Sequence, residues 1–240
     1  MKLYVYCAVE DVTALKQPPQ GISNSPVRLL PIDNLAVLVS ELDTETVPIT
    51  RDNALAHAAV VRSVLDRTTP LPFRFGTLVT EQQLQSYISH RRQALETNLG
   101  LVRDCIEMSV KIIWSVASDN EGEKQPNESE RGAGARFLEE RRQKLFGDER
   151  KAAEAAEISD WLHASVSVLA RDERITMRPS EKLVLAAAYL VERTKMGQFR
   201  DKIAEAAAAR PKLHFLLSGP WPPYSFANIE LEFKTRFGVS

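Results

Sequence analysis

The order of apolar segments in the second half of the chain constrains its fold more than any other feature. Residues 110–117 predict a buried strand, and residues 136–172, rich in Ala, Glu, Arg and Leu, predict a long helical region with Gly147 as a candidate break. Two strands, a short helix and a last strand are then predicted at residues 174–178, 182–191, 196–207 and 213–217. This β-α-β-β-α-β order predicts a ferredoxin-like domain, an antiparallel sheet with two helices on one face.

The first half of the chain predicts a divergent version of the same fold. Its expected elements are a strand, a β-hairpin turning at Asp33-Asn34, a helix and an extended segment, at residues 3–9, 27–40, 50–66 and 71–79. This is the order of the second half with the first helix replaced by a loop. The chain is therefore expected to be an α+β protein with an N-terminal domain at 1–106, a C-terminal ferredoxin-like domain at 107–218 and a tail at 219–240.

Capping residues mark the start of two helices in the first half. Thr50 can cap a helix whose predicted apolar face holds Ala54, Ala58, Val61 and Leu65. Thr80, with Gln83 three residues later, forms a capping box at the start of a second helix, whose apolar residues are Leu84, Tyr87, Ile88, Leu95, Leu99 and Val102.

Composition and charge argue against several classes of protein. With 44% apolar residues in 240, the chain can build a substantial core. The 31 basic and 32 acidic side chains give a net charge of -1, which creates no long-range attraction for nucleic acid or an anionic lipid membrane. The longest apolar run, residues 183–191, is far shorter than the roughly 20 residues that cross a bilayer. The N-terminus lacks a signal-peptide pattern, so we expect a cytoplasmic protein, with Cys7 and Cys105 as reduced, buried thiols.

No sequence pattern points to catalysis or to a bound cofactor. None of the histidines lies at a ligand spacing from another histidine, a cysteine or a carboxylate; they are His57, His90, His163 and His214. P-loop, GxGxxG, GxSxG and HExxH motifs are absent. We therefore expect no catalytic, cofactor-binding or metal-binding residue, and we expect His57 and His163 to be hydrogen-bonded at the borders of apolar faces and His214 to lie on the outer face of the last strand.

Two segments combine prolines with aromatic residues. In residues 70–77, Arg74 stands between Phe73 and Phe75, and in residues 219–226 three prolines alternate with Trp221, Tyr224 and Phe226. Proline fixes φ and removes a backbone donor, so a helix or a central strand cannot contain the second segment. Arg74, Phe75, Trp221, Tyr224 and Phe226 are candidate partner-binding residues, because Arg and aromatic residues are enriched at interface hot spots. The alternative is that these side chains pack over the sheet and seal the core.

Five motifs in the order LYVYCAV, His57, PLPFRFGT, VKIIW and GPWPPYSFA resemble the gas vesicle protein F/L family, and in particular its cyanobacterial-type F members. The resemblance spans essentially the whole chain. It implies a non-enzymatic accessory or minor structural protein of the gas vesicle, with a soluble cytoplasmic pool. The implied partners are the hydrophobic shell subunit, gas vesicle protein A, and other gas vesicle accessory proteins. One departure is Ala58, where an acidic residue would be expected after the histidine.

Two other hypotheses stay open on the residues alone. A cleft between the two domains could bind a small ligand or a substrate, since ligand sites are common at such places. The sheets could bind nucleic acid, although the aromatic RNA-binding pattern of ferredoxin-like sheets is absent.

Overall fold

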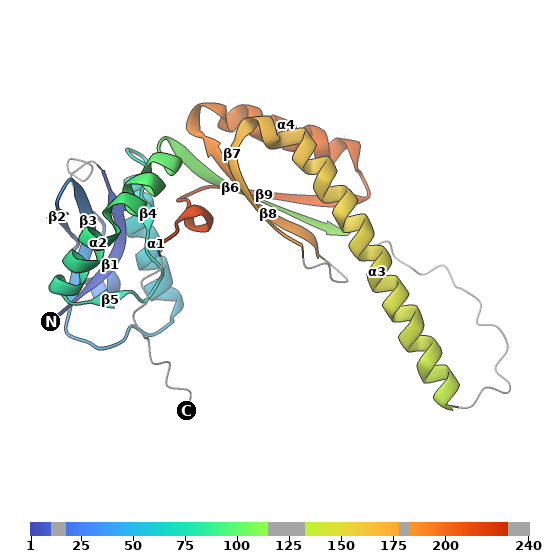
Figure 1. Cartoon of the computed structure of the whole chain (residues 1–240), viewed down its shortest axis with the longest axis horizontal. Helices are drawn as coiled ribbons and strands as arrows, with labels where there is room; N and C mark the ends of the chain where they lie inside the picture. The colour runs from blue at the N-terminus through green and yellow to red at the C-terminus, as the bar shows by residue number, and fades with distance from the viewer. Residues whose placement is uncertain (11–17, 115–132, 178–182, 230–240) are drawn as a thin grey trace. The chain divides into compact units, whose positions relative to one another are not determined.

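The computed structural model describes residues 1–10, 18–114, 133–177 and 183–229, with the side chains of residues 133–148 excepted. The protein is an α+β chain that divides into two compact units (Figure 1). The first unit holds Met1–Glu107 together with Pro220–Ser240, and the second holds Met108–Gly219. The C-terminal segment, expected as a separate tail, is thus grouped with the first unit by its contacts.

The first unit is built on an antiparallel sheet with the order β2-β3-β1-β4, in which β5 also pairs with β1. Its strands are β1 (Lys2–Val9), β2 (Arg28–Ile32), β3 (Leu35–Leu42), β4 (Leu71–Pro72) and β5 (Leu78–Val79). The first strand and the hairpin are confirmed, and Asp33 adopts the left-handed conformation of a tight turn at φ 54°. The extended segment at residues 71–79 is divided into two short strands.

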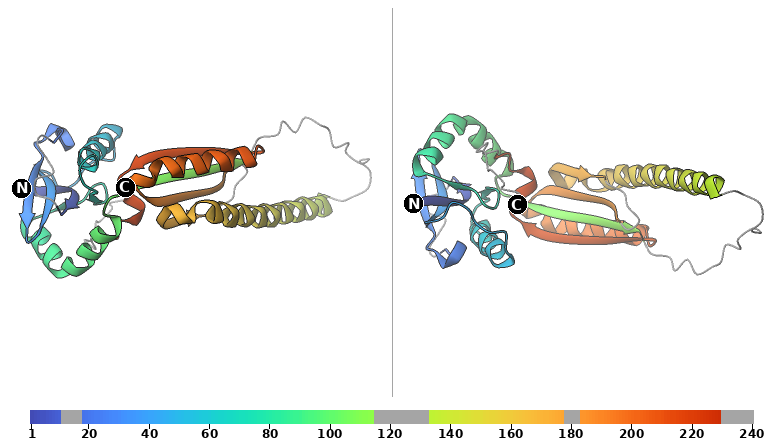
Figure 2. Two further views of the ribbon diagram at one scale, coloured as in Figure 1. Left: turned by 90° about the horizontal axis from the view of Figure 1, so that it is seen from above. Right: turned by 90° about the horizontal axis from the view of Figure 1, so that it is seen from below.

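A β-bulge in β1 decides which of its side chains face each helix. The register with β3 shifts between Val5 and Cys7, which leaves Tyr6 as the extra residue. A bulge resets the alternation of a strand, so Tyr4, Tyr6 and Cys7 all join one core cluster with the valines of helix α1 (Arg51–Leu65). Helix α2 (Glu81–Val102) covers the opposite face of the sheet (Figure 2). Both faces of β1 are therefore buried.

Helix α1 begins at the predicted cap but buries a different face. The Thr50 hydroxyl accepts a hydrogen bond from the Asn53 N–H at 3.2 Å. Ala54 and Ala58, predicted to be buried, are exposed. The buried residues are His57, Val60, Val61, Val64 and Leu65. The larger valines remove more apolar area from water than the alanines would, and they set the rotation of the helix.

Helix α2 confirms its predicted start and most of its apolar face. The Gln83 N–H donates to the Thr80 hydroxyl at 3.2 Å, and the Thr80 N–H donates to Gln83 Oε1 at 2.8 Å. These two bonds form the predicted capping box. The buried residues are Leu84, Ile88, Leu95, Leu99 and Val102, while Tyr87 is half-buried.

The second unit has the ferredoxin-like arrangement that the sequence predicts. Its elements are β6 (Cys105–Trp114), α3 (Ala133–Val166), β7 (Ala170–Thr176), β8 (Leu183–Glu192), α4 (Met196–Ala209) and β9 (Leu213–Trp221). The strand order is β7-β8-β6-β9, and both helices cover one face of the sheet (Figure 2). Phe199 of α4 packs on Tyr189 at a ring distance of 5.3 Å, and Trp161 of α3 packs on Phe215 at 6.3 Å. His214 lies exposed on the other face, as predicted.

Several predicted bounds in the second unit are wrong. Strand β6 starts at Cys105 instead of residue 110, and β9 continues past residue 217 to Trp221. Helix α3 passes through Gly147 without a break and ends at Val166, because residues 170–172 join strand β7. Residues 119–134 are acidic and contain glycine, a composition that predicts a solvated loop, and they lie almost wholly outside the described residues.

The extension of β9 changes the context of the proline-rich segment. Gly219, Pro220 and Trp221 belong to the strand, and only the following residues leave it. Because β9 is at the edge of its sheet, Pro220 does not interrupt a ladder on both sides.

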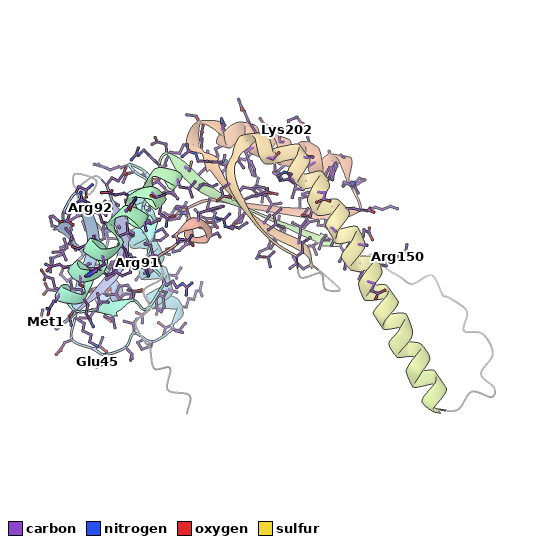
Figure 3. All side chains as sticks on the ribbon, viewed as in Figure 1. Met1, Glu45, Arg91, Arg92, Arg150 and Lys202 are labelled. Atoms are coloured by element: carbon purple, nitrogen blue, oxygen red, sulfur yellow. The ribbon has the colours of Figure 1, made fainter. Side chains whose placement is uncertain are left out.

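Exposed charged side chains lie on both units (Figure 3). Arg91 and Arg92 are exposed on α2, Arg150 on α3 and Lys202 on α4. Among the described residues, no helix is both long enough and apolar enough to cross a membrane.

Candidate functional site

Five ring side chains meet in the first unit and join four separate parts of the chain. They are Tyr4 and Tyr6 from β1, His57 from α1, Phe75 from the β4–β5 connection and Tyr224 from the C-terminal segment. The His57 ring stacks on Tyr6 at 5.6 Å and meets Phe75 edge-on at 5.8 Å. Tyr224 approaches it at 6.3 Å. We call these five residues the aromatic cluster.

His57 is a neutral, buried ring with one ring nitrogen that has no hydrogen-bond partner among the described residues. The Tyr4 hydroxyl accepts a hydrogen bond from the Gly76 N–H at 3.1 Å and lies 3.0 Å from His57 Nδ1. If its own proton is donated to Nδ1, the proton of the neutral imidazole is on Nε2. Burial lowers the pKa of His57 to about 4. Nε2 is buried without a hydrogen-bond partner among the described residues, which corrects the expectation of a fully satisfied histidine.

Tyr6 holds the loop before β2 against the sheet. Its hydroxyl accepts a hydrogen bond from the Ile22 N–H at 2.9 Å and lies 3.0 Å from Ser40 Oγ. Gly21 sits directly beneath this hydroxyl, since a Cβ atom at Gly21 would lie 2.1 Å from it. The close approach of the loop thus requires glycine on steric grounds.

A buried carboxylate fixes the C-terminal segment to the first unit. Glu107 is only 6% exposed, and its two carboxylate oxygens accept hydrogen bonds from the Ser225 N–H and the Ser225 hydroxyl, both at 2.8 Å. Burial raises the pKa of Glu107, against the opposing effect of these two bonds. Burial likewise raises the pKa of the Tyr224 hydroxyl, with smaller contributions from Cys7, Tyr4 and Glu107.

The candidate partner-binding residues lie in different environments. Trp221 and Tyr224 are 40% and 41% exposed, and the Arg62 guanidinium lies over the Trp221 ring at 5.6 Å. Phe226 is 2% exposed and therefore anchors the segment in the core. In the other proline-rich segment, Arg74 is exposed, while Phe75 is half-buried in the aromatic cluster.

The cysteines and His163 are among the other candidate ligands that the sequence offers within the described residues. Cys7 and Cys105 are buried and not joined in a disulfide, as predicted, and burial raises the pKa of the Cys7 thiol. His163 is exposed, with Nδ1 2.6 Å from Glu173 Oε1. Within the described part of the chain, no group of three or more His, Cys, Asp or Glu side chains could hold a metal ion.

Comparison with known proteins identifies the family. The model of the family described as gas vesicle synthesis protein GvpL/GvpF matches residues 2–228. The chain belongs to the GvpL/GvpF family. It is 27% identical to gas vesicle protein L2 of Halobacterium salinarum, over 93% of this chain and 90% of that protein. It is 29% identical to gas vesicle protein F of a Streptomyces species, over 91% of this chain and 93% of that protein.

Two crystal structures of cyanobacterial GvpF share the fold of this GvpL/GvpF protein. GvpF from Anabaena superposes with a TM-score of 0.74 at 19% identity, over 95% of this chain and 97% of that one. GvpF from Microcystis aeruginosa gives a TM-score of 0.70 at 20% identity, over 95% and 99%. The family membership makes this protein an accessory protein of the gas vesicle.

The sequence predicts two segments of this site, residues 70–77 and 219–226, but not the residues that connect them. Glu107 carries a sequence signal of its own, because a carboxylate between Ile106 and Met108 in an apolar strand must find a partner or stay solvated. His57 carries another, because it precedes Val60 and Val61 by three and four residues and therefore shares their face. Its contact with Tyr224 has no local sequence signal.

Proposed function

We propose that this GvpL/GvpF protein is a non-enzymatic accessory protein that binds the hydrophobic shell subunit, gas vesicle protein A, during nucleation or assembly of the vesicle. By covering the subunit it prevents aggregation. The observation that supports this proposal is the pair of half-exposed aromatic side chains, Trp221 and Tyr224, on an anchored and proline-stiffened backbone.

The anchoring lowers the entropic cost of binding. Pro222, Pro223 and Phe226 are buried around the two exposed rings, and Ser225 is bonded to Glu107. A rigid aromatic contact loses little conformational freedom when a partner covers it. A shell subunit with exposed apolar surface aggregates in water, so it fits such a contact.

The other candidate residues take different roles in this proposal. Arg74 is exposed and forms no ion pair with a described residue, so it is available as a polar contact at the edge of the site. Phe75 and Phe226 support the site from within. Other gas vesicle accessory proteins are further partners, and the protein is located at the gas vesicle with a soluble cytoplasmic pool.

Binding to immobilised shell subunit tests the proposal. The double variant Trp221→Ala/Tyr224→Ala should bind at least about 30-fold more weakly, because a truncated hot-spot aromatic costs about 2 kcal/mol or more. Leu216→Ala is the matched control, since Leu216 is a similarly exposed apolar residue, at 53%, in the second unit. If the double variant folds and binds as tightly as the wild type, the contact lies elsewhere and the proposal for these residues is refuted.

Localisation provides an independent test. Immunodetection is carried out on intact vesicles and on collapsed, washed vesicles. A signal in either preparation supports attachment to the vesicle, and a signal in neither, with all the protein in the soluble fraction, contradicts it.

A further inference from the structure

Residues 222–229, which we call the tail strap, are held to the first unit mainly by apolar contacts. Pro222, Pro223, Phe226 and Ile229 are buried. The two prolines have no N–H to donate, and the N–H groups of Tyr224 and Phe226 bond within the strap, to Pro222 and Pro223. The Glu107 carboxylate accepts two hydrogen bonds from Ser225, one from its N–H and one from its hydroxyl. This pair is a charged, polar link between the strap and the rest of the first unit.

The closed tail strap keeps two polar groups away from water at a cost. Glu107 is a carboxylate that is 6% exposed, and its raised pKa shows that burial outweighs the two hydrogen bonds from Ser225. His57 Nε2 has no hydrogen-bond partner in the part of the chain that the structure describes, and the His57 ring lies next to Tyr224 of the strap. Both groups would regain water if the strap lifted, so they favour opening while the apolar residues favour closure.

We propose that the tail strap is a two-state element whose closed form presents Trp221 and Tyr224 to the partner, and that Glu107 and Ser225 are the positioning residues that set its balance. The binding part of this inference rests on the proposed function. An apolar partner segment that contacts both rings binds the closed strap more tightly than the open one. By linkage, such a partner also shifts the strap toward closure.

Hydrogen exchange of the full chain, without any partner, tests the strap itself. In the wild type, the amides of residues 224–229 should exchange faster than those of β1 and β3, because the strap opens without global unfolding. Ser225→Ala removes a hydrogen bond to a charged group and should accelerate this exchange by about tenfold. Ser86→Ala, at an exposed position of α2, is the matched control and should change nothing in the strap.

Glu107→Gln separates the charge from the hydrogen bonds. The amide oxygen can accept from the Ser225 N–H, and the amide N–H can donate to the Ser225 hydroxyl, so both contacts persist without a buried charge. Exchange in the strap should therefore become several-fold slower than in the wild type. If the amides of the strap exchange as slowly as those of β1 and β3, the strap does not open separately and the two-state element is refuted. Faster exchange in Glu107→Gln would overturn the role of the charge.

Binding to the shell subunit tests the link to function. Affinity should scale with the closed fraction of the strap, so Ser225→Ala weakens binding in proportion to the closed fraction that it loses, and Glu107→Gln strengthens binding by at most the inverse of the closed fraction in the wild type. If exchange shows a measurable loss of the closed fraction in Ser225→Ala but the affinity is unchanged, the positioning role is refuted while the strap stands. This result differs from failure of the proposed function, in which Trp221→Ala/Tyr224→Ala also leaves the affinity unchanged.

Discussion

Protonation of His57 should destabilise this protein as the pH falls from 7 to 5. The imidazole is 4% exposed, and burial lowers its pKa from 6.5 to about 4. A group whose pKa is lowered by folding favours the folded state in its deprotonated form. Its contribution is complete above pH 6.5 and is lost as the pH falls toward 4.

The size of the effect follows from the two pKa values. At pH 5 the unfolded histidine is almost fully protonated, whereas the folded one is protonated in only about one molecule in ten. The linked loss of unfolding free energy between pH 7 and pH 5 is about 2 kcal/mol, and it approaches about 3 kcal/mol below pH 4. Glu107 acts in the opposite direction, because its raised pKa means that protonation relieves the cost of a buried charge.

A comparison with His57→Gln isolates the histidine. Glutamine does not titrate, and its amide group, with one acceptor and two donors, can replace His57 Nδ1 as the hydrogen-bond partner of the Tyr4 hydroxyl. Urea unfolding at pH 7, 6 and 5 gives the free energy of unfolding for each protein, and contributions from all other groups cancel in the difference. His90→Gln makes the same replacement at an exposed histidine of α2 and is the control for the chemical change itself. Equal losses in the wild type and His57→Gln would refute a buried neutral His57.

Three further predictions concern the stability of the fold and are tested by substitution at Gly21, Thr80 and Phe226. Gly21→Ala should lower the free energy of unfolding by about 2 kcal/mol, because the new Cβ atom would lie 2.1 Å from the Tyr6 hydroxyl. Gly100→Ala in α2 is the control and should raise it by about 0.5–1 kcal/mol, because its Cβ atom would meet nothing within 4 Å. Equal effects of the two substitutions in urea unfolding would contradict the steric argument. Thr80→Ala should cost about 1 kcal/mol through loss of the capping box, and Thr80→Ser should restore most of it. Phe226→Ala should cost about 3 kcal/mol if the tail strap is anchored in the core, and a cost near zero in the melting curve would show that it is not.

The local patterns of the sequence determined most of the secondary structure. The Thr80 capping box, the Asp33-Asn34 turn and the β-α-β-β-α-β order each depend on residues that are neighbours in the chain, and the structure confirms all of them. The five motifs that resemble the family also follow one another in order, and the family model matches the same span. Such signals need no knowledge of tertiary contacts.

The tertiary structure alone decided the face of α1 and the site that depends on it. Periodicity permitted a face with Ala54 and Ala58, but the area available to bury against β1 favoured the valines, and His57 entered the core with them. The bulge at Tyr6 then placed both tyrosines of β1 beside that histidine. Neither choice is visible in the spacing of one segment.

The sequence likewise does not predict where the proline-rich segment packs. Its prolines predicted a stiff, irregular backbone, which the structure shows after Trp221. Its attachment depends on Ser225 and Glu107, which are 118 residues apart, and no periodic or capping signal relates residues at that separation. The sequence by itself determined which elements form and which aromatic residues stand out. The fold decided which of them are buried, because burial depends on long-range contacts that exist only when the chain is closed.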